Sequence, residues 1–285
     1  MPAEPCGVFV AGTDTGVGKT MVAAALAAWC RGQRLRVGVM KPVATGGRGR
    51  LGPESPLVGD ARVLAAAAWA DDPVSLINPV WFPEPLAPWT AAQRAGRSIR
   101  LGPVLRAFRT LAAQHEVMIV EGAGGLLVPL SRRLTMAHLA QQFRLAVLLV
   151  ARPGLGTLNH TLLSLECLRR LRLRCHGVVI NYARPASREP MARLAERTNP
   201  DLLRHWAPVL GVLPHRSAIE RRTDPFGAAW IAAGLGVSTL RRLCASTDRG
   251  RSGAGRIFDK PNPLCYSHRQ RPPVTGMSTV VVEEG

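Results

Sequence analysis

Lysine is almost absent from this 285-residue sequence, which has 37 basic residues but only three lysines, Lys19, Lys41 and Lys260. Arginine therefore carries the formal net charge of +18. A charge this high is typical of proteins that bind nucleic acids. Here the arginines are scattered and not interleaved with aromatic residues, which indicates a compositional bias spread over a solvated surface. We therefore expect no nucleic-acid partner.

The sequence also lacks paired cysteines, a targeting segment and a long apolar run. Its six cysteines lie far apart: Cys6, Cys30, Cys167, Cys175, Cys244 and Cys265. Without a C-x-x-C pair, they favour reduced thiols over a disulfide frame or a zinc site. The opening MPAEPCG has no basic region, and the longest apolar stretch, near residues 145–151, is too short to span a bilayer. We expect a soluble, cytoplasmic protein with no membrane partner.

Short runs rich in Val, Ile and Leu recur along the chain: 7–11, 37–40, 117–120, 145–150, 178–180 and 209–213. Because they are apolar throughout, they predict strands that are buried on both faces. Helical patterns lie between most of them, so we expect a doubly wound α/β fold with a mainly parallel sheet of about six or seven strands. Residues 1–243 are predicted to form one domain. The Gly-, Pro- and Arg-rich residues 244–285 are predicted to be a disordered or accessory tail.

The stretch GTDTGVGKT, residues 12–20, follows the phosphate-loop pattern G-x-x-x-x-G-K-[ST], but its first glycine comes one position early. The shift is tolerable, because backbone N–H groups at the start of a helix hold the phosphates. An apolar run before the loop and an Ala-rich helical pattern after it provide the strand-loop-helix setting of a P-loop NTPase. We predict a nucleotide site in which the Thr20 hydroxyl binds Mg2+. Thr13 and Thr15 fit helix caps and ligand contacts equally well.

Lys41 is the other lysine among the first fifty residues, and it directly follows the second apolar run. In a sequence that uses arginine nearly everywhere, it indicates a site that needs a compact cation near a transferring phosphoryl group. The alternative is a surface lysine that escaped the bias. Glu121 ends the third run beside a glycine cluster, where a carboxylate is a natural magnesium ligand. Ligands bind at the carboxyl ends of parallel strands, so four segments are expected to converge: 12–20, 41–46, 121–125 and Asn181.

Five motifs occur in order along the chain: GTDTGVGKT, KPVATG, INPVWFPEPLAPWTAAQ, VEGAGGLLVPL and LNHTLLSLECLRRL…GVVIN. Together they closely resemble the dethiobiotin synthetases of the biotin pathway over roughly residues 7–240, and that family shares the shifted first glycine. The resemblance implies a ligase that uses ATP and Mg2+. It would bind CO2 to 7,8-diaminopelargonate as a carbamate, phosphorylate the carbamate and close the ureido ring, releasing ADP and phosphate.

The resemblance also implies roles for individual residues. Lys19 and Lys41 would be catalytic, binding phosphate and carbamate oxygens, and Thr20, Asp60 and Glu121 would surround Mg2+. ATP contacts are expected from a larger set: Gly16, Val17, Gly18, Lys19, Thr20, Asp60, Glu121, Gly122, Ala123, Gly124, Asn181, Pro214, His215 and Arg216. Substrate contacts are expected from Thr15, Thr45, Gly156 and Asn159. The last two lie at a helix start that would serve the partner subunit of a homodimer.

Three positions depart from the family pattern or allow another interpretation. Asp60 could instead be a helix N-cap carboxylate. Gly16 stands where some members of the family have glutamate, and the segment from Pro214 to Arg216 lacks an aromatic residue seen in some members. His160, although it lies near the expected site, is interpreted as part of the helix start and not as a catalytic base.

Two other classes of protein begin with a similar loop. Partitioning or septum-site ATPases carry a signature lysine ahead of the G-K-T, but this position is Asp14 here. Amidating synthetases of the cobyrinate type continue into a glutaminase domain, for which this chain has no remaining length. Both alternatives are therefore less favoured than the synthetase.

Overall fold

The computed structural model describes residues 6–47 and 59–244 of the chain. Six strands form one sheet in the order β2-β5-β1-β6-β7-β8, and every neighbouring pair is parallel. The strands of this sheet are β1 (Gly7–Gly12), β2 (Val37–Met40), β5 (Val117–Gly125), β6 (Ala146–Ala151), β7 (Cys175–Asn181) and β8 (Val209–Leu213). Each of the six predicted apolar runs is thus a strand of this sheet, and the doubly wound α/β fold is confirmed.

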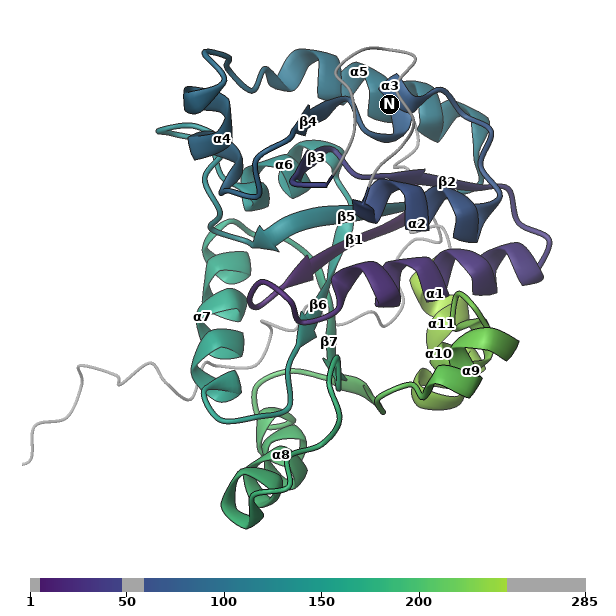
Figure 1. Cartoon of the computed structure of the whole chain (residues 1–285), viewed down its shortest axis with the longest axis vertical. Helices are drawn as coiled ribbons and strands as arrows, with labels where there is room; N and C mark the ends of the chain where they lie inside the picture. Colours follow the sequence, from purple (N-terminus) through teal and green to yellow (C-terminus); the bar gives the residue numbers. More distant parts are fainter. Residues whose placement is uncertain (1–5, 48–58, 245–285) are drawn as a thin grey trace, which may run out of the picture.

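Helices cover both faces of the sheet (Figure 1). Their bounds are α1 (Lys19–Gly32), α2 (Gly59–Ala68), α3 (Val74–Ile77), α4 (Pro88–Arg94), α5 (Leu101–Gln114), α6 (Met136–Phe143), α7 (Thr157–Arg170), α8 (Pro190–Leu203), α9 (Ala218–Thr223), α10 (Ala228–Leu235) and α11 (Val237–Cys244). None of the helices in the described part of the chain has the length and apolar character needed to cross a membrane.

Alternate residues of the central strand β1 enter two separate cores. Phe9 and Ala11 pack in the core that includes residues of α5, α6 and α7, whereas Val8 and Val10 pack against α1, α2, α10 and α11. All four side chains are fully buried. This alternation explains the continuous apolar runs, because both faces of each central strand are covered and neither tolerates a polar residue.

The structure differs from the predicted strands in two places. Strand β5 continues beyond the predicted run 117–120 to Gly125, through the glycine cluster, and Gly125 pairs with Gly12 of β1 after a register shift. A second, two-stranded parallel sheet joins β3 (Val43–Thr45) to β4 (Val80–Phe82). Strands of three residues carry too little periodicity to be recognised in a sequence.

The predicted boundary at residues 243–244 stays a prediction, since residues 245–285 lie outside the described part of the chain. The same applies to Lys260 and Cys265. All five cysteines that are described are free thiols, as expected from their spacing: Cys6, Cys30, Cys167, Cys175 and Cys244.

Candidate functional site

The loop between β1 and α1 closes around the ammonium group of Lys19. Lys19 is the first residue of α1, and its Nζ donates a hydrogen bond to the main-chain oxygen of Asp14 at 3.2 Å. Gly16 and Gly18 have φ angles of 73° and 91°, which lie in the left-handed region that glycine adopts at little cost. The loop therefore combines a helix N-terminus with a buried cation, an arrangement that binds phosphate.

Asn181, the last residue of β7, connects its strand end to this loop. Its Nδ2 donates to the main-chain oxygen of Val17 at 2.8 Å, and its side chain is buried. A Cβ atom at Gly18 would lie only 2.1 Å from the same Nδ2. One of the two N–H donors of the amide is thereby committed to the loop, which fixes the orientation of the amide and its acceptor oxygen.

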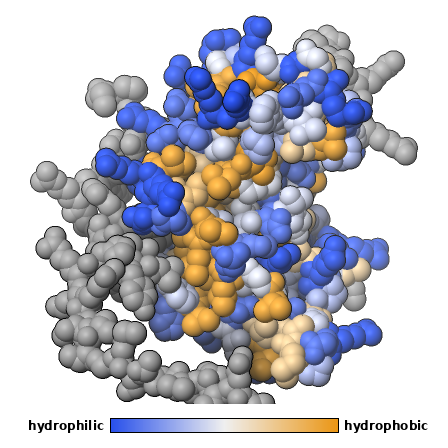
Figure 2. All heavy atoms as spheres, turned by 90° about the vertical axis from the view of Figure 1, so that its left-hand side faces the viewer, coloured by the Kyte–Doolittle hydropathy of each residue, from blue (hydrophilic) through white to orange (hydrophobic). Residues whose placement is uncertain are grey.

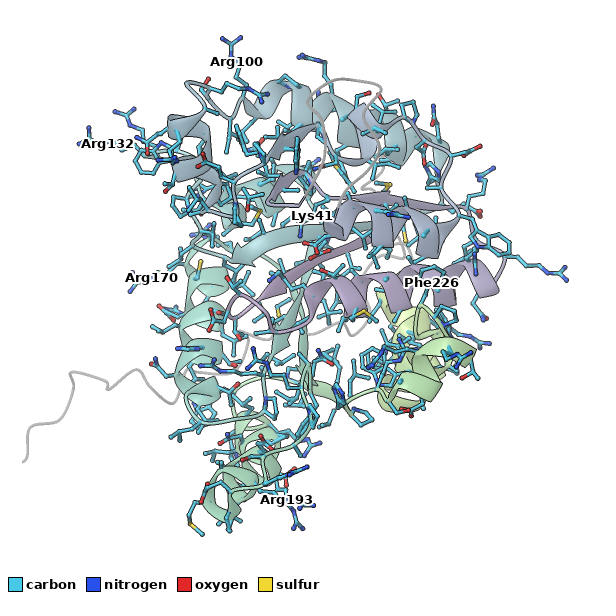
Figure 3. The ribbon with its side chains drawn as sticks, viewed as in Figure 1. Lys41, Arg100, Arg132, Arg170, Arg193 and Phe226 are labelled. Atoms are coloured by element: carbon cyan, nitrogen blue, oxygen red, sulfur yellow. The ribbon has the colours of Figure 1, made fainter. Side chains whose placement is uncertain are left out.

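Lys41 follows β2 and lies near the centre of the molecule (Figure 3). Its main chain is held on both sides, because its N–H donates to Ile77 O at 2.7 Å and its carbonyl accepts from Asn78 Nδ2 at 2.6 Å. Its side chain is 3% exposed. The interpretation of Lys41 as a surface lysine is therefore wrong, and Asn78, to which the sequence assigned no role, is the residue that fixes its backbone.

The arginines labelled in Figure 3 contrast with this buried lysine. They project from the periphery of the molecule and are exposed: Arg100, Arg132, Arg170 and Arg193. A solvated surface was the setting predicted for the arginine bias.

The three residues expected to surround Mg2+ converge beside Lys41. Lys41 Nζ lies 2.7 Å from both Asp60 Oδ2 and Glu121 Oε1. Thr20 Oγ1 donates to the same Glu121 oxygen at 2.9 Å. Asp60 lies in the first turn of α2, where its carboxylate pairs with Lys41.

These residues fit a magnesium ion. Glu121 Oε2 is buried and has no hydrogen-bond partner among the described residues, so a ligand is needed to satisfy it. Within residues 6–47 and 59–244, no group of three or more His, Cys, Asp or Glu side chains would hold a metal ion by itself. Mg2+ is typically bound by one or two carboxylates together with substrate phosphates and water, which matches a site with Asp60, Glu121 and the Thr20 hydroxyl.

Burial and the neighbouring charges shift the pKa values of the ionisable side chains in the site. Burial lowers the pKa of Lys41, but the carboxylates of Glu121 and Asp60 outweigh it and raise the pKa above its ordinary value. Burial raises the pKa of Asp60, but the adjacent ammonium reverses the shift and the pKa is lowered. Burial raises the pKa of Glu121, which Lys41 opposes. Burial, followed by the nearby Lys41 charge, lowers the pKa of Lys19. Lys41 is thus a stable cation at neutral pH.

The glycine cluster at the end of β5 lies beside these charges. Gly122 O accepts a hydrogen bond from Lys41 Nζ at 3.2 Å. Gly124 has a φ of 62°, and a Cβ atom there would lie 3.7 Å from Thr15 Oγ1 of the phosphate loop. Ala123 is partly buried against the core. The cluster is therefore adjacent to both the lysine and the loop.

The segment that follows β8 is arranged differently from a simple base-binding loop. Pro214 and His215 are exposed next to the end of β7, since Leu213 pairs with Asn181. The buried guanidinium of Arg216 instead donates to the main-chain oxygens of Glu220 and Asp224. A base contact by the Arg216 side chain stays a prediction that the described contacts do not favour.

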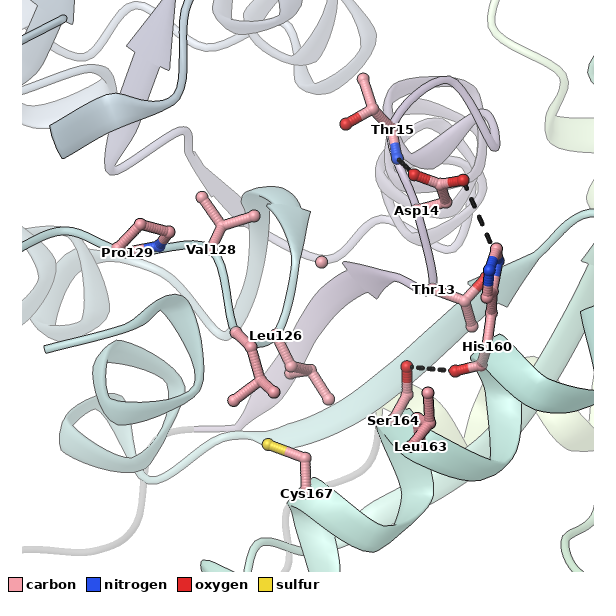
Figure 4. Close-up of a pocket in the computed structure, with 12 residues that line it drawn as sticks. Thr13, Asp14, Thr15, Leu126, Val128, Pro129, His160, Leu163, Ser164 and Cys167 are labelled. Carbon is pink, nitrogen blue, oxygen red and sulfur yellow. Dashed lines mark hydrogen bonds and ion pairs between the residues drawn. The ribbon is translucent and has the colours of Figure 1, made fainter. Parts of the chain in front are cut away.

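A cavity of about 410 Å³ opens beside the phosphate loop (Figure 4). Its lining includes the polar side chains of Asp14, Thr15 and His160 and the apolar side chains of Leu126 and Leu163. Of the four predicted substrate contacts, only Thr15 lines this cavity. Thr45 ends β3, Gly156 caps the N-terminus of α7 and Asn159 is exposed on its first turn.

The Asp14 carboxylate of the loop lies near Arg152, which follows β6, and near His160, in the first turn of α7. Asp14 Oδ2 lies 3.6 Å from Arg152 Nη1 and 4.0 Å from His160 Nδ1 (Figure 4 shows the second contact). Asp14 Oδ1 accepts from the Thr15 N–H at 2.7 Å. The sequence interpretation did not find this contact, because more than 130 residues separate its partners and no local pattern signals it.

The fold and the loop define the class of protein: a P-loop nucleotide-binding α/β protein. Residues 6–223 match a family model described as "AAA domain". The MinC:MinD cell division protein complex of Aquifex aeolicus contains a chain of similar structure, with a TM-score of 0.50, 13% sequence identity and coverage of 87% of this chain and 99% of that chain. At this identity the similarity shows the fold alone.

Curated relatives narrow the class to one family. The chain is 44% identical over 228 residues to the ATP-dependent dethiobiotin synthetase BioD of Anaeromyxobacter dehalogenans (strain 2CP-C), covering 79% of this chain and 97% of the relative. Proteins of the same name in Thermodesulfovibrio yellowstonii and Bacillus licheniformis are 36% and 39% identical, covering 75% and 73% of this chain and 91% and 85% of those proteins. The chain belongs to the dethiobiotin synthetase family, as the sequence motifs indicated.

Gly18→Ala should abolish tight nucleotide binding, because the new methyl group would collide with the Asn181 amide and the φ of 91° disfavours a side chain. We expect the Kd for ATP, measured by calorimetry, to rise at least about a hundredfold, or about 2.7 kcal/mol. Gly16→Ala is the matched control, since it also has a positive φ but meets no atom within 4 Å. Equal losses in the two variants would contradict the role of the Asn181 contact.

Proposed function

We propose that this protein is an ATP-dependent dethiobiotin synthetase that closes the ureido ring of dethiobiotin from 7,8-diaminopelargonate, CO2 and ATP. The observation that carries the proposal is the convergence of Lys19, Lys41, Asp60 and Glu121 at adjacent strand ends in a chain of this family. Anionic carbamate and γ-phosphate must approach one another in this reaction. A site with two buried lysines beside a phosphate loop supplies the positive charge that their approach needs.

The reaction has three steps that balance in atoms. One amine of the substrate attacks CO2, forms a C–N bond and loses a proton to give the carbamate. A carbamate oxygen then attacks the γ-phosphorus, which gives a carbamic-phosphoric anhydride and releases ADP. Finally the second amine attacks the carbamoyl carbon, the C–O bond to phosphate breaks, and loss of a proton leaves the cyclic urea and inorganic phosphate.

Each lysine has a separate task in this scheme. Lys19, at the start of α1, holds the β- and γ-phosphate oxygens. Lys41 donates to oxygens of the carbamate and of the γ-phosphate as charge spreads over them during transfer. Thr20, Asp60 and Glu121 would hold Mg2+, which would neutralise negative charge on the transferring phosphates. Support for the metal comes from the unpartnered, buried Glu121 Oε2.

ATP would be recognised by its base at the end of β7. The Asn181 amide donates one N–H to Val17 O, which fixes its orientation, and its oxygen would accept from the ligand. An acceptor in a fixed position pairs with the amino group of adenine and opposes the carbonyl oxygen that guanine carries at the same place. Pro214 and His215, exposed at the neighbouring strand end, would cover the base.

A homodimer would complete the substrate site. Three large apolar side chains around the cavity and the start of α7 are exposed: Leu127, Leu155 and Leu163, at 65%, 85% and 61%. Figure 2, which faces the α7 side of the molecule, shows apolar side chains gathered along this face. In the proposed dimer, N–H groups at the start of α7, near Gly156 and Asn159, receive the carboxylate of the substrate bound to the partner subunit. The free thiols of the described cysteines support a cytoplasmic location.

Purified protein should convert 7,8-diaminopelargonate to dethiobiotin when it is supplied with bicarbonate, Mg2+ and ATP. Mass spectrometry would measure the product, with equimolar ADP and phosphate as independent readouts. Omitting the diamine is the control for uncoupled ATP hydrolysis. ATP hydrolysis that DNA stimulates and the diamine does not would overturn the proposal.

Lys41→Arg should lose activity although its charge is preserved. The planar guanidinium is a rigid fork, whereas the site holds a compact ammonium that lies 2.7 Å from both Asp60 and Glu121. We expect kcat to fall by roughly two orders of magnitude, which corresponds to a loss of about 3 kcal/mol of transition-state stabilisation. The change in KM should be smaller, because the contact strengthens in the transition state. Lys260→Arg is the matched control. Full turnover in a Lys41→Arg protein with a native circular dichroism spectrum would remove Lys41 from the site.

The active form should sediment as two chains. Leu163→Glu, which places a charge on the exposed face of α7, should shift the protein to a monomer and reduce turnover. Val237→Glu is the control, since this residue is 45% exposed on α11. Analytical ultracentrifugation at the assay concentration would measure the mass. A fully active monomer would contradict composite sites.

A further inference from the structure

The ammonium group of Lys41 has no hydrogen-bond donor left for a substrate. An ammonium has three N–H donors. In the structure it has three acceptors: Glu121 Oε1 and Asp60 Oδ2, each at 2.7 Å, and Gly122 O at 3.2 Å. In this arrangement, groups of the protein accept all three hydrogen bonds of the ammonium, so none of its donors is directed at a phosphate or carbamate oxygen.

The two carboxylates that form ion pairs with Lys41 are the same ones that would hold Mg2+. Asp60 and Glu121 each give Lys41 an oxygen, and Thr20 donates to the Glu121 oxygen that Lys41 also contacts. A divalent cation on these carboxylates would compete with the ammonium for its acceptors. It would also repel the ammonium strongly, because Lys41 and Glu121 are almost fully buried and charges there are weakly screened.

We propose that Lys41 alternates between two states and that Mg2+ binding switches it from one to the other. Without Mg2+ and nucleotide, Lys41 is the cation between Asp60 and Glu121, and it neutralises the buried Glu121 carboxylate and the partly exposed Asp60 carboxylate. When Mg2+ binds there, the ammonium moves away and donates to carbamate and phosphate oxygens. The inference rests on the proposed function for the identity of the metal ligands and adds that the two cations exchange.

Only the side chain has to move in this exchange. The backbone of Lys41 is fixed through Ile77 O and Asn78 Nδ2, whereas its four-carbon stem is flexible. Lys41 thus becomes available to the substrate only when the metal and its nucleotide are present. The switch ties the reactive arrangement to a loaded site and avoids an unpaired buried carboxylate in the free protein.

The three lysines of the chain make this exchange directly observable. In protein labelled with 13C-lysine, each lysine gives one ε-methylene signal in NMR spectra, and Lys19→Arg and Lys260→Arg assign two of them, leaving Lys41. We expect ADP with Mg2+ to shift the Lys41 signal and ADP with EDTA to leave it in place. A Lys41 signal that stays unmoved with Mg2+, or moves equally with EDTA, overturns the proposal.

Metal affinity provides a second measurement. Mn2+, as a paramagnetic probe, should bind nucleotide-free Lys41→Met at least about tenfold more tightly than the wild type, because its competitor is gone. Lys19→Met is the matched control: it removes a cation from the same site, but Lys19 makes no ion pair with Asp60 or Glu121 among the described contacts. Equal gains in both variants would overturn the exchange. If Lys41→Met does not fold by circular dichroism, the NMR experiment on wild-type side chains decides.

The outcome for the exchange is separable from the outcome for the proposed function. Dethiobiotin formation is measured on the same labelled preparation. Product together with an unmoved Lys41 signal overturns the exchange and leaves the function standing. A moved signal without product supports the exchange and overturns the function.

Discussion

The buried ion pair between Lys41 and Glu121 is the interaction on which the site depends. It joins the carboxyl ends of two neighbouring strands, β2 and β5, and both side chains are almost fully buried. Breaking such a pair by removing one partner typically costs about 3–5 kcal/mol, because the remaining charge is left unpaired. Thr20 and Asp60 attach to this pair from α1 and α2, so two strands and two helices meet at one pair of charges.

The parallel sheet makes this meeting possible. All six strands end at the same edge, and the loop after β1, Lys41 after β2, Glu121 in β5 and Asn181 in β7 are therefore brought together from distant parts of the chain. A close contact between the loop and β7 completes the arrangement, because Gly18 has no side chain and leaves room for the Asn181 amide. A ligand at this edge contacts several strands at once, which is the usual location of binding sites in doubly wound folds.

The same fold occurs in a chain of the MinC:MinD cell division protein complex of Aquifex aeolicus. What distinguishes this chain is therefore the site and not the sheet. Asp14 in the loop makes an ionic contact with Arg152. Asp14 stands at the position for which the sequence comparison expects a lysine in partitioning ATPases. The family assignment rests on relatives that are 36% and 44% identical to this chain over most of their length.

The sequence by itself determined the elements whose signals are local. Continuous apolar runs predicted all six strands of the main sheet, because strands covered on both faces exclude polar residues. The rarity of lysine singled out Lys41, and the glycine spacing identified the phosphate loop. Only the tertiary structure decided which groups these residues contact. The bonds of Lys41 to Glu121 and Asn78 span 80 and 37 residues, and those distances leave no periodicity that a sequence pattern could show. Short β3 and β4 likewise form only because chain folding places them side by side, where backbone pairing compensates for their weak individual preference.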